Sequence, residues 1–190
     1  LRNISFKVHR YDCIAIIGKN GVGKTTLLKI LAGKQESTDG EFKWGYGTDV
    51  GYYAQENEEL DLNLTVWQNV ERLDWGNMDK RKFLGGFLIS GDMVDQKVCT
   101  LSGGEKTRLA LAKLFAGRHN VLLLDEPTTY LDPESQKILL NALKEYKGTI
   151  IIVSHEPVFV NELGIEKVLL MPEERFTYFK DEYLERVGAI

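Results

Sequence analysis

The sequence predicts an α/β fold in which a mostly parallel β-sheet is covered by helices on both faces. The first observation is a set of three apolar runs that are typical of strands buried on both faces: Cys13–Ile17, Asn120–Asp125 and Thr149–Val153. The second is a set of segments with apolar residues at helical spacing: Thr25–Ala32, Lys106–Ala116 and 133–147. Buried strands that alternate with such helices indicate crossover connections, and these join parallel strands.

Other segments indicate strands that make the sheet mixed. Apolar and polar residues alternate from Ile4 to Val8, as in a half-buried strand. The segment Glu41–Ala54 is rich in Gly, Tyr and Trp and predicts short antiparallel strands. Lys167–Met171 and Phe176–Phe179 predict a terminal hairpin, and Asp181–Val187 predicts a short last helix.

Capping residues mark the ends of the predicted helices. Gly33, Gly117 and Gly148 follow them at their C-terminal ends. Asp132-Pro133 starts a helix, with Asp as the N-cap and Pro at the first helical position. The segment from Leu64 to about Leu88 is predicted to be mostly helical, in short pieces broken by glycines. We therefore expect residues 1–190 to form one domain, with a helical subdomain at roughly 64–116.

Composition limits the class of protein. Apolar residues make up 43% and charged residues 27%, which is ordinary for a globular domain, and the net charge of −4 gives no reason to expect nucleic-acid binding. The longest apolar runs are far too short to span a bilayer, so no direct membrane insertion is expected. Cys13 and Cys99 do not make a disulfide framework and are expected to be buried, inert thiols of a cytoplasmic protein. The abrupt start at Leu1 suggests a fragment of a longer chain.

The loop after the first buried strand is Gly18-Lys19-Asn20-Gly21-Val22-Gly23-Lys24-Thr25, followed directly by Thr26. It matches the phosphate-loop pattern Gly-x-x-x-x-Gly-Lys-Thr in full. The glycines allow backbone N–H groups to curl around phosphates, Lys24 places a charge on the outer phosphates, and the Thr25 hydroxyl can ligate Mg²⁺. The next helix points its positive N-terminus at the anion. The flanking strand and helix disfavour the alternative, a glycine-rich turn that binds nothing.

Two further strand ends carry groups suited to phosphate chemistry. Asp125 and Glu126 follow a buried strand, and in an α/β sheet ligands bind at the carboxyl ends of strands. Asp125 is the expected Mg²⁺ partner, and Glu126 could orient and deprotonate an attacking water. His155 follows the strand Thr149–Val153. A lone histidine is more often a surface residue, but three strand ends that converge on one edge favour a hydrogen-bond donor to a γ-phosphate.

The segment Leu101-Ser102-Gly103-Gly104-Glu105 precedes another predicted helix. Ser102 and Glu105 fit a capping box, which explains these two residues without any ligand. Capping does not explain two glycines in the first helical turn, where each costs about 1 kcal/mol relative to Ala. We therefore expect Gly103 and Gly104 to let an anion approach the backbone N–H groups of this second helix N-terminus.

Together these motifs resemble the ABC ATPases. Leu101–Glu105 matches the family signature LSGGE without a mismatch, Gln55 matches the Q-loop, and Tyr130–Asp132 matches the D-loop. The resemblance covers nearly the whole chain, and the motifs follow one another in the same order as in the family. It implies a P-loop NTPase fold of the ABC ATPase type that uses ATP and Mg²⁺.

The resemblance further implies that two such domains pair head to tail, with ATP between the phosphate loop of one and the signature of the other. The roles that it implies are Gln55 contacting Mg²⁺ and water, Glu126 as catalytic base, His155 as the γ-phosphate switch, and Ser102–Glu105 completing the partner's site. The aromatic residue that stacks on adenine in this family normally lies upstream of Leu1.

Within the ABC ATPases, the chain resembles the ABC-F family. The resemblance lies in Glu105–Leu114 and in Asp125–Asp132, while Gly51–Gln55 with Glu58–Asp61 is similar to the second nucleotide-binding domain of the YbiT-like branch. Such proteins carry two domains on one chain, lack membrane domains and act on the ribosome, as translation factors or in antibiotic resistance. Thr129-Tyr130 and Glu156-Pro157 depart from the usual Asn-His and Asp-Arg of the family.

Two other classes compete with this interpretation. The ATPase subunit of a membrane transporter would share every phosphate-contacting residue and would differ at a surface within roughly 56–99. A DNA-maintenance ATPase would insert a long coiled coil between phosphate loop and signature. Only the 77 residues from 25 to 101 separate Lys24 from Ser102, and they contain no heptad run, so the second class is rejected.

Overall fold

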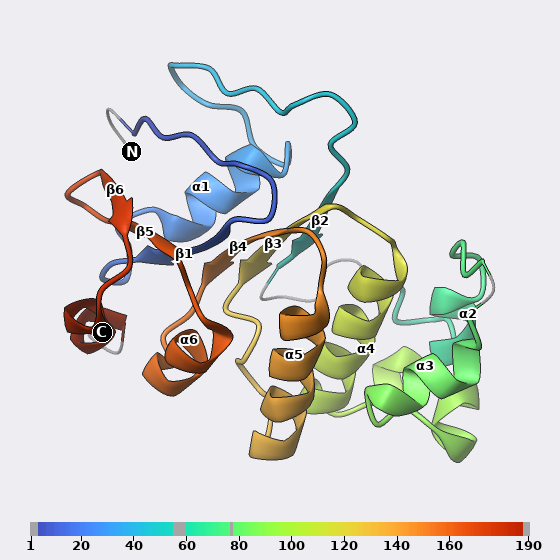
Figure 1. Ribbon diagram of the computed structural model, residues 1–190. Coiled ribbons are helices and arrows are strands. Elements are labelled where there is room, and N and C mark those ends of the chain that lie inside the picture. The colour runs from blue at the N-terminus through green and yellow to red at the C-terminus, as the bar shows by residue number, and fades with distance from the viewer. Residues whose placement is uncertain (1–3, 55–59, 77, 188–190) are drawn as a thin grey trace.

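The computed structural model describes residues 4–54, 60–76 and 78–187. Its centre is a six-stranded sheet with the order β2-β3-β4-β1-β5-β6 (Figure 1). The strands are β1 (Cys13–Ile17), β2 (Val50–Tyr53), β3 (Val121–Asp125), β4 (Thr149–Val153), β5 (Lys167–Leu170) and β6 (Arg175–Tyr178). All neighbouring pairs are parallel except β5 and β6, which form an antiparallel hairpin. The predicted mixed, mostly parallel sheet is confirmed.

Helices cover both faces of the sheet because the central strands are apolar on both sides. α1 (Lys24–Leu31) lies on one face, and α4 (Gly103–Ala116), α5 (Pro133–Glu145) and α6 (Pro157–Leu163) lie on the other (Figure 1). Successive residues of a strand enter different cores: Leu122 and Leu124 pack on the α4 side, whereas Leu123 packs on the α1 side. The sheet is thus a rigid support with both faces buried.

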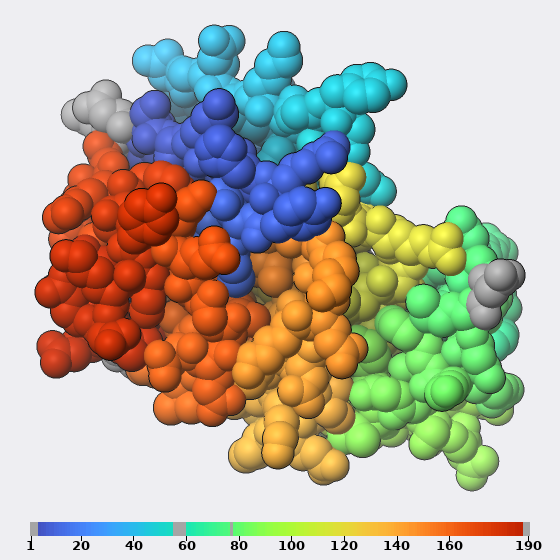
Figure 2. Space-filling model, viewed as in Figure 1, coloured from blue at the N-terminus to red at the C-terminus, as the bar shows by residue number. Residues whose placement is uncertain are grey.

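Shorter helices complete the chain. α2 (Val66–Val70), α3 (Lys80–Gly86) and the 3-10 turns η1 (Gly91–Asp95) and η2 (Val98–Thr100) precede α4. α2 and α3 contact α4 and form a lobe at one side of the molecule, green in Figure 2. The turn η3 (Asp181–Tyr183) and α7 (Leu184–Val187) form the predicted last helix. No helix among the described residues has the length and apolar character needed to cross a bilayer.

The expectation of short antiparallel strands across Glu41–Ala54 is wrong. Only Val50–Tyr53 is a strand, and it pairs in parallel with β3. The alternation from Ile4 to Val8 is real, since Ile4, Phe6 and Val8 pack on the α1-side core, but this segment forms no strand. Alternation reports which side chains are buried, whereas a strand also requires a hydrogen-bonded neighbour, which local sequence does not specify.

The cysteine prediction is half right. Cys13 is partly buried against the core, and burial raises the pKa of its thiol to about 12, so it is inert. Cys99 is exposed, which corrects the expectation of a buried thiol. Its backbone N–H binds the Leu62 carbonyl at 3.0 Å, so its place in the fold is set by the main chain rather than by packing of the thiol.

Candidate functional site

The carboxyl ends of β1, β3 and β4 meet around one cavity of about 520 Å³. These strands are adjacent in the sheet, in the order β3-β4-β1. The cavity is lined by the loop after β1 and the first turn of α1, and by residues that follow β3 and β4: Asn20, Gly21, Gly23, Lys24, Thr25, Thr26, Asp125, Glu126, Thr128, Thr129, Val153, His155 and Glu156. The predicted convergence of three strand ends therefore exists.

The loop from Gly18 to Gly23 has the backbone that its glycines permit. Gly21 and Gly23 have φ angles of 79° and 102°, in the left-handed region that favours glycine. Gly23 directly precedes α1, so the free N–H groups of the first turn of α1 face the cavity. Gly18 has a different reason to be glycine, because a Cβ there would collide with the carbonyl oxygen of Met171.

The Lys24 side chain folds back over this loop. Its ammonium donates to the carbonyl oxygens of Gly18 and Lys19, at 2.7 Å and 3.0 Å. Lys24 is buried, and this burial lowers the pKa of its ammonium, while the nearby carboxylates of Glu126 and Asp125 act in the opposite direction. The cation is thus held by neutral carbonyls at the base of the cavity.

Asp125 ends β3 and is only 1% exposed. Burial raises the pKa of its carboxyl, although a hydrogen bond from Thr25 and the charges of Lys29 and Lys24 favour the ionised form. Its Oδ1 atom is buried and has no hydrogen-bond partner. Buried polar atoms are nearly always paired, so this oxygen is available to a ligand that enters the cavity.

Glu126 and His155 form a pair beside Asp125. The Glu126 Oε1 atom lies 3.0 Å from Nε2 of His155, and Oε2 accepts from the His155 backbone N–H at 3.1 Å. The His155 Nδ1 atom lies 3.1 Å from the Val187 carbonyl oxygen, which can only accept. Nδ1 is therefore the ring nitrogen that donates to this carbonyl, and Nε2 is the one that faces Glu126. Burial raises the pKa of the Glu126 carboxyl, while the contacts with His155 act in the opposite direction.

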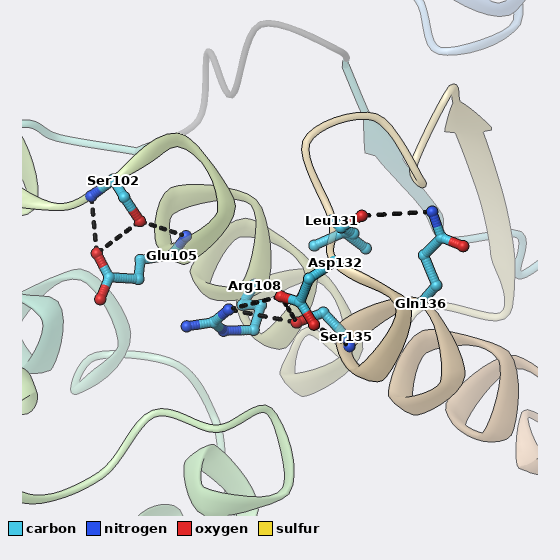
Figure 3. Close-up of polar contacts among 7 residues, drawn as sticks. All are labelled: Ser102, Glu105, Arg108, Leu131, Asp132, Ser135 and Gln136. Carbon is cyan, nitrogen blue, oxygen red and sulfur yellow. Dashed lines mark hydrogen bonds and ion pairs between the residues drawn. The ribbon is translucent and has the colours of Figure 1, made fainter.

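The Ser102–Glu105 segment lies outside this cavity, at the start of α4. The capping box is confirmed: Glu105 N–H donates to Ser102 Oγ at 3.3 Å, and Ser102 N–H donates to Glu105 Oε2 at 2.7 Å (Figure 3). The hydroxyl of Ser102 also donates to Glu105 Oε2, and these bonds lower the pKa of Glu105. The two glycines differ, because a Cβ on Gly104 would come within 3.0 Å of the Tyr130 carbonyl oxygen, whereas Gly103 has ordinary room.

Several predicted site residues fall elsewhere. Gln55 lies outside the described residues. Gly18, Lys19 and Val22 do not line the cavity, although the first two bind Lys24 through their carbonyls. Sequence reasoning missed Thr128, Thr129 and Glu156 as lining residues. The available signal was their position, within four residues of Asp125 for the two threonines and next to His155 for Glu156.

Comparison with known proteins agrees with this geometry. The model of the family described as ABC transporter matches residues 1–129. The YbiT protein of Escherichia coli O157:H7 is 38% identical over 193 residues, covering 98% of this chain and 36% of YbiT. ABC transporter F family member 5 of Arabidopsis thaliana is 40% identical over 166 residues, covering 85% of this chain and 24% of the relative. The chain thus spans about a third or less of the length of these relatives.

Solved structures show the same fold. A complex of the archaeal ribosomal stalk protein aP1 with the archaeal ribosome recycling factor aABCE1 matches with a TM-score of 0.72 and 30% identity, over 86% of this chain and 33% of that one. The ATP-binding cassette MJ0796, in a dimeric post-hydrolysis state bound to ADP and Pi, matches with a TM-score of 0.78 over 95% of this chain and 90% of that one. Its identity of 23% supports the fold alone. By its family model and its fold, this chain is an ATPase domain that belongs to the ABC transporter family.

Proposed function

We propose that this chain binds ATP with Mg²⁺ in the 520 Å³ cavity and hydrolyses it as one member of a head-to-tail pair of such domains. The observation that carries the proposal is the meeting of Lys24, Asp125, Glu126 and His155 at one edge of the sheet, in front of the N-terminus of α1. A triphosphate has the charge and oxygen atoms that a helix N-terminus and a buried ammonium bind best.

The residues present fit a magnesium ion. Thr25 and Asp125 touch each other at the cavity wall, and the unpartnered Oδ1 of Asp125 is a hard oxygen ligand of the kind that Mg²⁺ prefers. Among the described residues, no group of three or more His, Cys, Asp or Glu side chains is placed to hold a metal ion, so phosphate oxygens and water would complete the coordination. A bound Mg²⁺ would neutralise charge on the phosphates.

Glu126 is proposed as the base that takes a proton from the attacking water. Burial raises the pKa of this carboxyl toward the working pH, and a general base is most effective when its pKa lies near that pH. The His155 backbone N–H donates to Oε2 of Glu126 and its ring lies 3.0 Å from Oε1, so His155 orients the carboxylate. When a γ-phosphate enters, Nε2 would exchange its contact with Glu126 for the phosphate, because Nδ1 is engaged with Val187. Gln55 is proposed to contact Mg²⁺ and the attacking water.

The Ser102–Gly104 end of α4 is proposed to complete the site of the partner domain. It lies outside this chain's own cavity, which fits a role in a second site. Ser102 is exposed. Its capping box engages the N–H groups of Ser102 and Glu105 but not those of Gly103 and Gly104. Each domain would then contribute half of each of two ATP sites.

We further propose that the chain is the second nucleotide-binding domain of a longer, cytoplasmic ABC-F protein that acts on the ribosome. The relatives at about 40% identity include a protein named for the F family, and they are much longer than this chain. A structural relative is named as a ribosome recycling factor. The alternative, an ATPase subunit of a membrane transporter, shares the phosphate-binding residues, so the site itself does not separate the two.

The test is co-sedimentation of the full-length protein with ribosomes in the presence of ATP, using Glu126→Gln to trap the bound state. We expect this variant to pellet with ribosomes only when ATP is present. Glu134→Gln, an exposed glutamate on α5, is the matched control and should not be trapped. A trapped variant that stays off ribosomes and instead sediments with membrane vesicles would replace the ribosome proposal with the transporter alternative.

A further inference from the structure

Three contacts hold the start of α4 against the loop that leads into α5. Gly104 lies close to the Tyr130 carbonyl, because a Cβ on Gly104 would be only 3.0 Å from this oxygen and the carbonyl would have to shift. Arg108 Nη1 donates to Ser135 Oγ at 3.2 Å and lies 3.5 Å from Asp132 Oδ2. The residues that make the last two contacts, Arg108 of α4 with Asp132 and Ser135 at the start of α5, are drawn in Figure 3. The start of α4 and the start of α5 are thus held as one unit.

Arg108 is the centre of this unit. Its side chain is only 15% exposed, and its Nε atom is buried without a hydrogen-bond partner. The Ser135 hydroxyl accepts from Arg108 and donates to Asp132 Oδ2 at 2.7 Å, so it links the two charged side chains. Asp132 also accepts from the Ser135 backbone N–H at 3.0 Å, as the N-cap of α5. One carboxylate therefore caps α5 and binds α4.

The loop between Glu126 and Asp132 is held by its own backbone hydrogen bonds. Thr129 N–H binds the Glu126 carbonyl and Leu131 N–H binds the Thr128 carbonyl, both at 3.1 Å, so the loop consists of two successive turns. Glu126 and Tyr130 have φ angles of 49° and 67°, which non-glycine residues adopt only when their surroundings hold them there. We therefore expect a shift of the loop at its Asp132 end to displace Glu126 at the other end.

We propose that Arg108 is a positioning residue that fixes the Ser102–Gly104 end of α4 relative to Glu126. This inference rests on the proposed function, in which Glu126 serves this chain's own ATP and Ser102–Gly104 serve the partner's. Arg108 is not among the residues that line the cavity around Glu126, and it does not belong to the Ser102–Gly104 segment. By tying α4 to the loop 126–132, it keeps the two half-sites of one chain in a fixed geometry, so both ATP molecules of the pair meet complete sites together.

The test compares Arg108→Met with Arg108→Lys in the full-length protein. Arg108→Met keeps the length and apolar stem but loses the charge and donors, whereas Arg108→Lys keeps one donor that can reach Asp132. Arg72→Met, at an exposed arginine near α2, makes the same chemical change away from α4. ATPase kinetics and amide hydrogen exchange are measured for each variant.

We expect Arg108→Met to lower kcat about 10- to 100-fold, as a displaced catalytic group does, with the KM for ATP unchanged because Arg108 is outside the cavity. Exchange at the amides of Glu105, Lys106, Thr129 and Leu131 should accelerate about tenfold, while amides of β3 and β4 keep their rates. Arg108→Lys should recover part of both effects, and Arg72→Met should show neither.

An unchanged kcat in Arg108→Met would overturn the inference. So would an equal acceleration of exchange in β3 and β4, because that outcome assigns Arg108 to global stability alone. If the parent protein itself hydrolyses no ATP, the proposed function fails. The exchange measurement then still decides whether Arg108 fixes α4 to the loop, so the two failures are distinguishable.

Discussion

At the scale of single residues, the cavity holds charges in places that cost the fold free energy. Asp125 is buried with an unpartnered oxygen, and burial raises its pKa and that of Glu126 while lowering that of Lys24. Each shift means that folding disfavours the charged form. Groups kept in such a state are typical of binding and catalytic sites, where a ligand supplies the missing interactions. The cost should therefore be measurable by removing single charges.

Asp125→Asn should stabilise the ligand-free chain at pH 8 by about 1 kcal/mol, the usual scale when strain at a functional site is relieved. A raised folded-state pKa means that the native state binds the proton more tightly. Stability is then lost as pH rises from the unfolded value of 3.8 through the folded pKa, and the deficit is complete above it. Urea unfolding between pH 4 and pH 8 measures the difference.

The gain from Asp125→Asn should shrink as pH falls, because Asp125 in the folded state then takes up a proton and becomes neutral, as Asn is. Asp95→Asn, at an exposed carboxylate in η1, is the control and should change stability little at any pH. A variant that is less stable than the parent at pH 8 would mean that the Asp125 charge supports the fold, contrary to the argument from burial.

Lys24→Ala should weaken ATP binding roughly 10- to 100-fold, because a charged hydrogen bond to phosphate contributes about 1.5–3 kcal/mol. Hydrolysis should fall with it, since the ammonium would no longer reach the outer phosphates. Titration calorimetry with ATP and a phosphate-release assay measure the two effects. Lys137→Ala, at an exposed position of α5, should leave both unchanged. Undiminished turnover in Lys24→Ala would refute the assignment of the phosphate loop.

At the scale of helices and strands, the elements that local sequence specifies were predictable. β1, β3 and β4 are continuous apolar runs, and the caps at Ser102 and Asp132 have the geometry that their residue types predict. These features depend on neighbours within four residues. The same rule explains why the loop 18–25 and its place at a sheet edge could be read from the sequence.

The predictions that failed have three different causes, and the first is a pairing partner that is distant in sequence. β2 pairs with β3 although 67 residues from 54 to 120 separate them, and nothing in Val50–Tyr53 specifies that partner. α6 was missed, although Pro157 at its first position, apolar Phe159, Val160 and Leu163, and Gly164 as its cap were readable signals. The left-handed backbone of Glu126 and Tyr130 had no sequence signal, because neither residue type favours it.

Two capping boxes in this chain allow the fold and function of α4 to be separated. Thr65 caps α2 with Gln68 just as Ser102 caps α4 with Glu105. Thr65→Ala and Ser102→Ala should each lower the free energy of unfolding by about 1 kcal/mol. Only Ser102→Ala should also lower ATP turnover in the full-length protein, because only that cap lies at the proposed partner site. Equal turnover in the two variants would reduce Ser102 to a structural cap.

At the scale of the whole molecule, the segments proposed to serve two ATP sites do not line the same cavity. The cavity contains the phosphate loop and the acids, whereas the Ser102–Gly104 end lies outside it. Arg108 and Asp132 join these halves within the chain, at 3.5 Å. In the proposed pair, a second domain would bring a signature segment to the cavity, and the dependence of activity on that second domain is the property that tests the arrangement.

The isolated 190-residue chain should be monomeric and should hydrolyse ATP weakly. Because each cavity lacks the signature segment of a partner, turnover requires two chains to meet. The rate per chain should therefore rise in proportion to chain concentration while pairs remain rare, whereas a complete single-chain site would give a constant rate. Sedimentation velocity gives the oligomeric state and phosphate release gives the rate, with Glu126→Gln as the inactive background. Rapid turnover by monomers, independent of concentration, would contradict the head-to-tail pair and would mean that the groups around this one cavity suffice for catalysis.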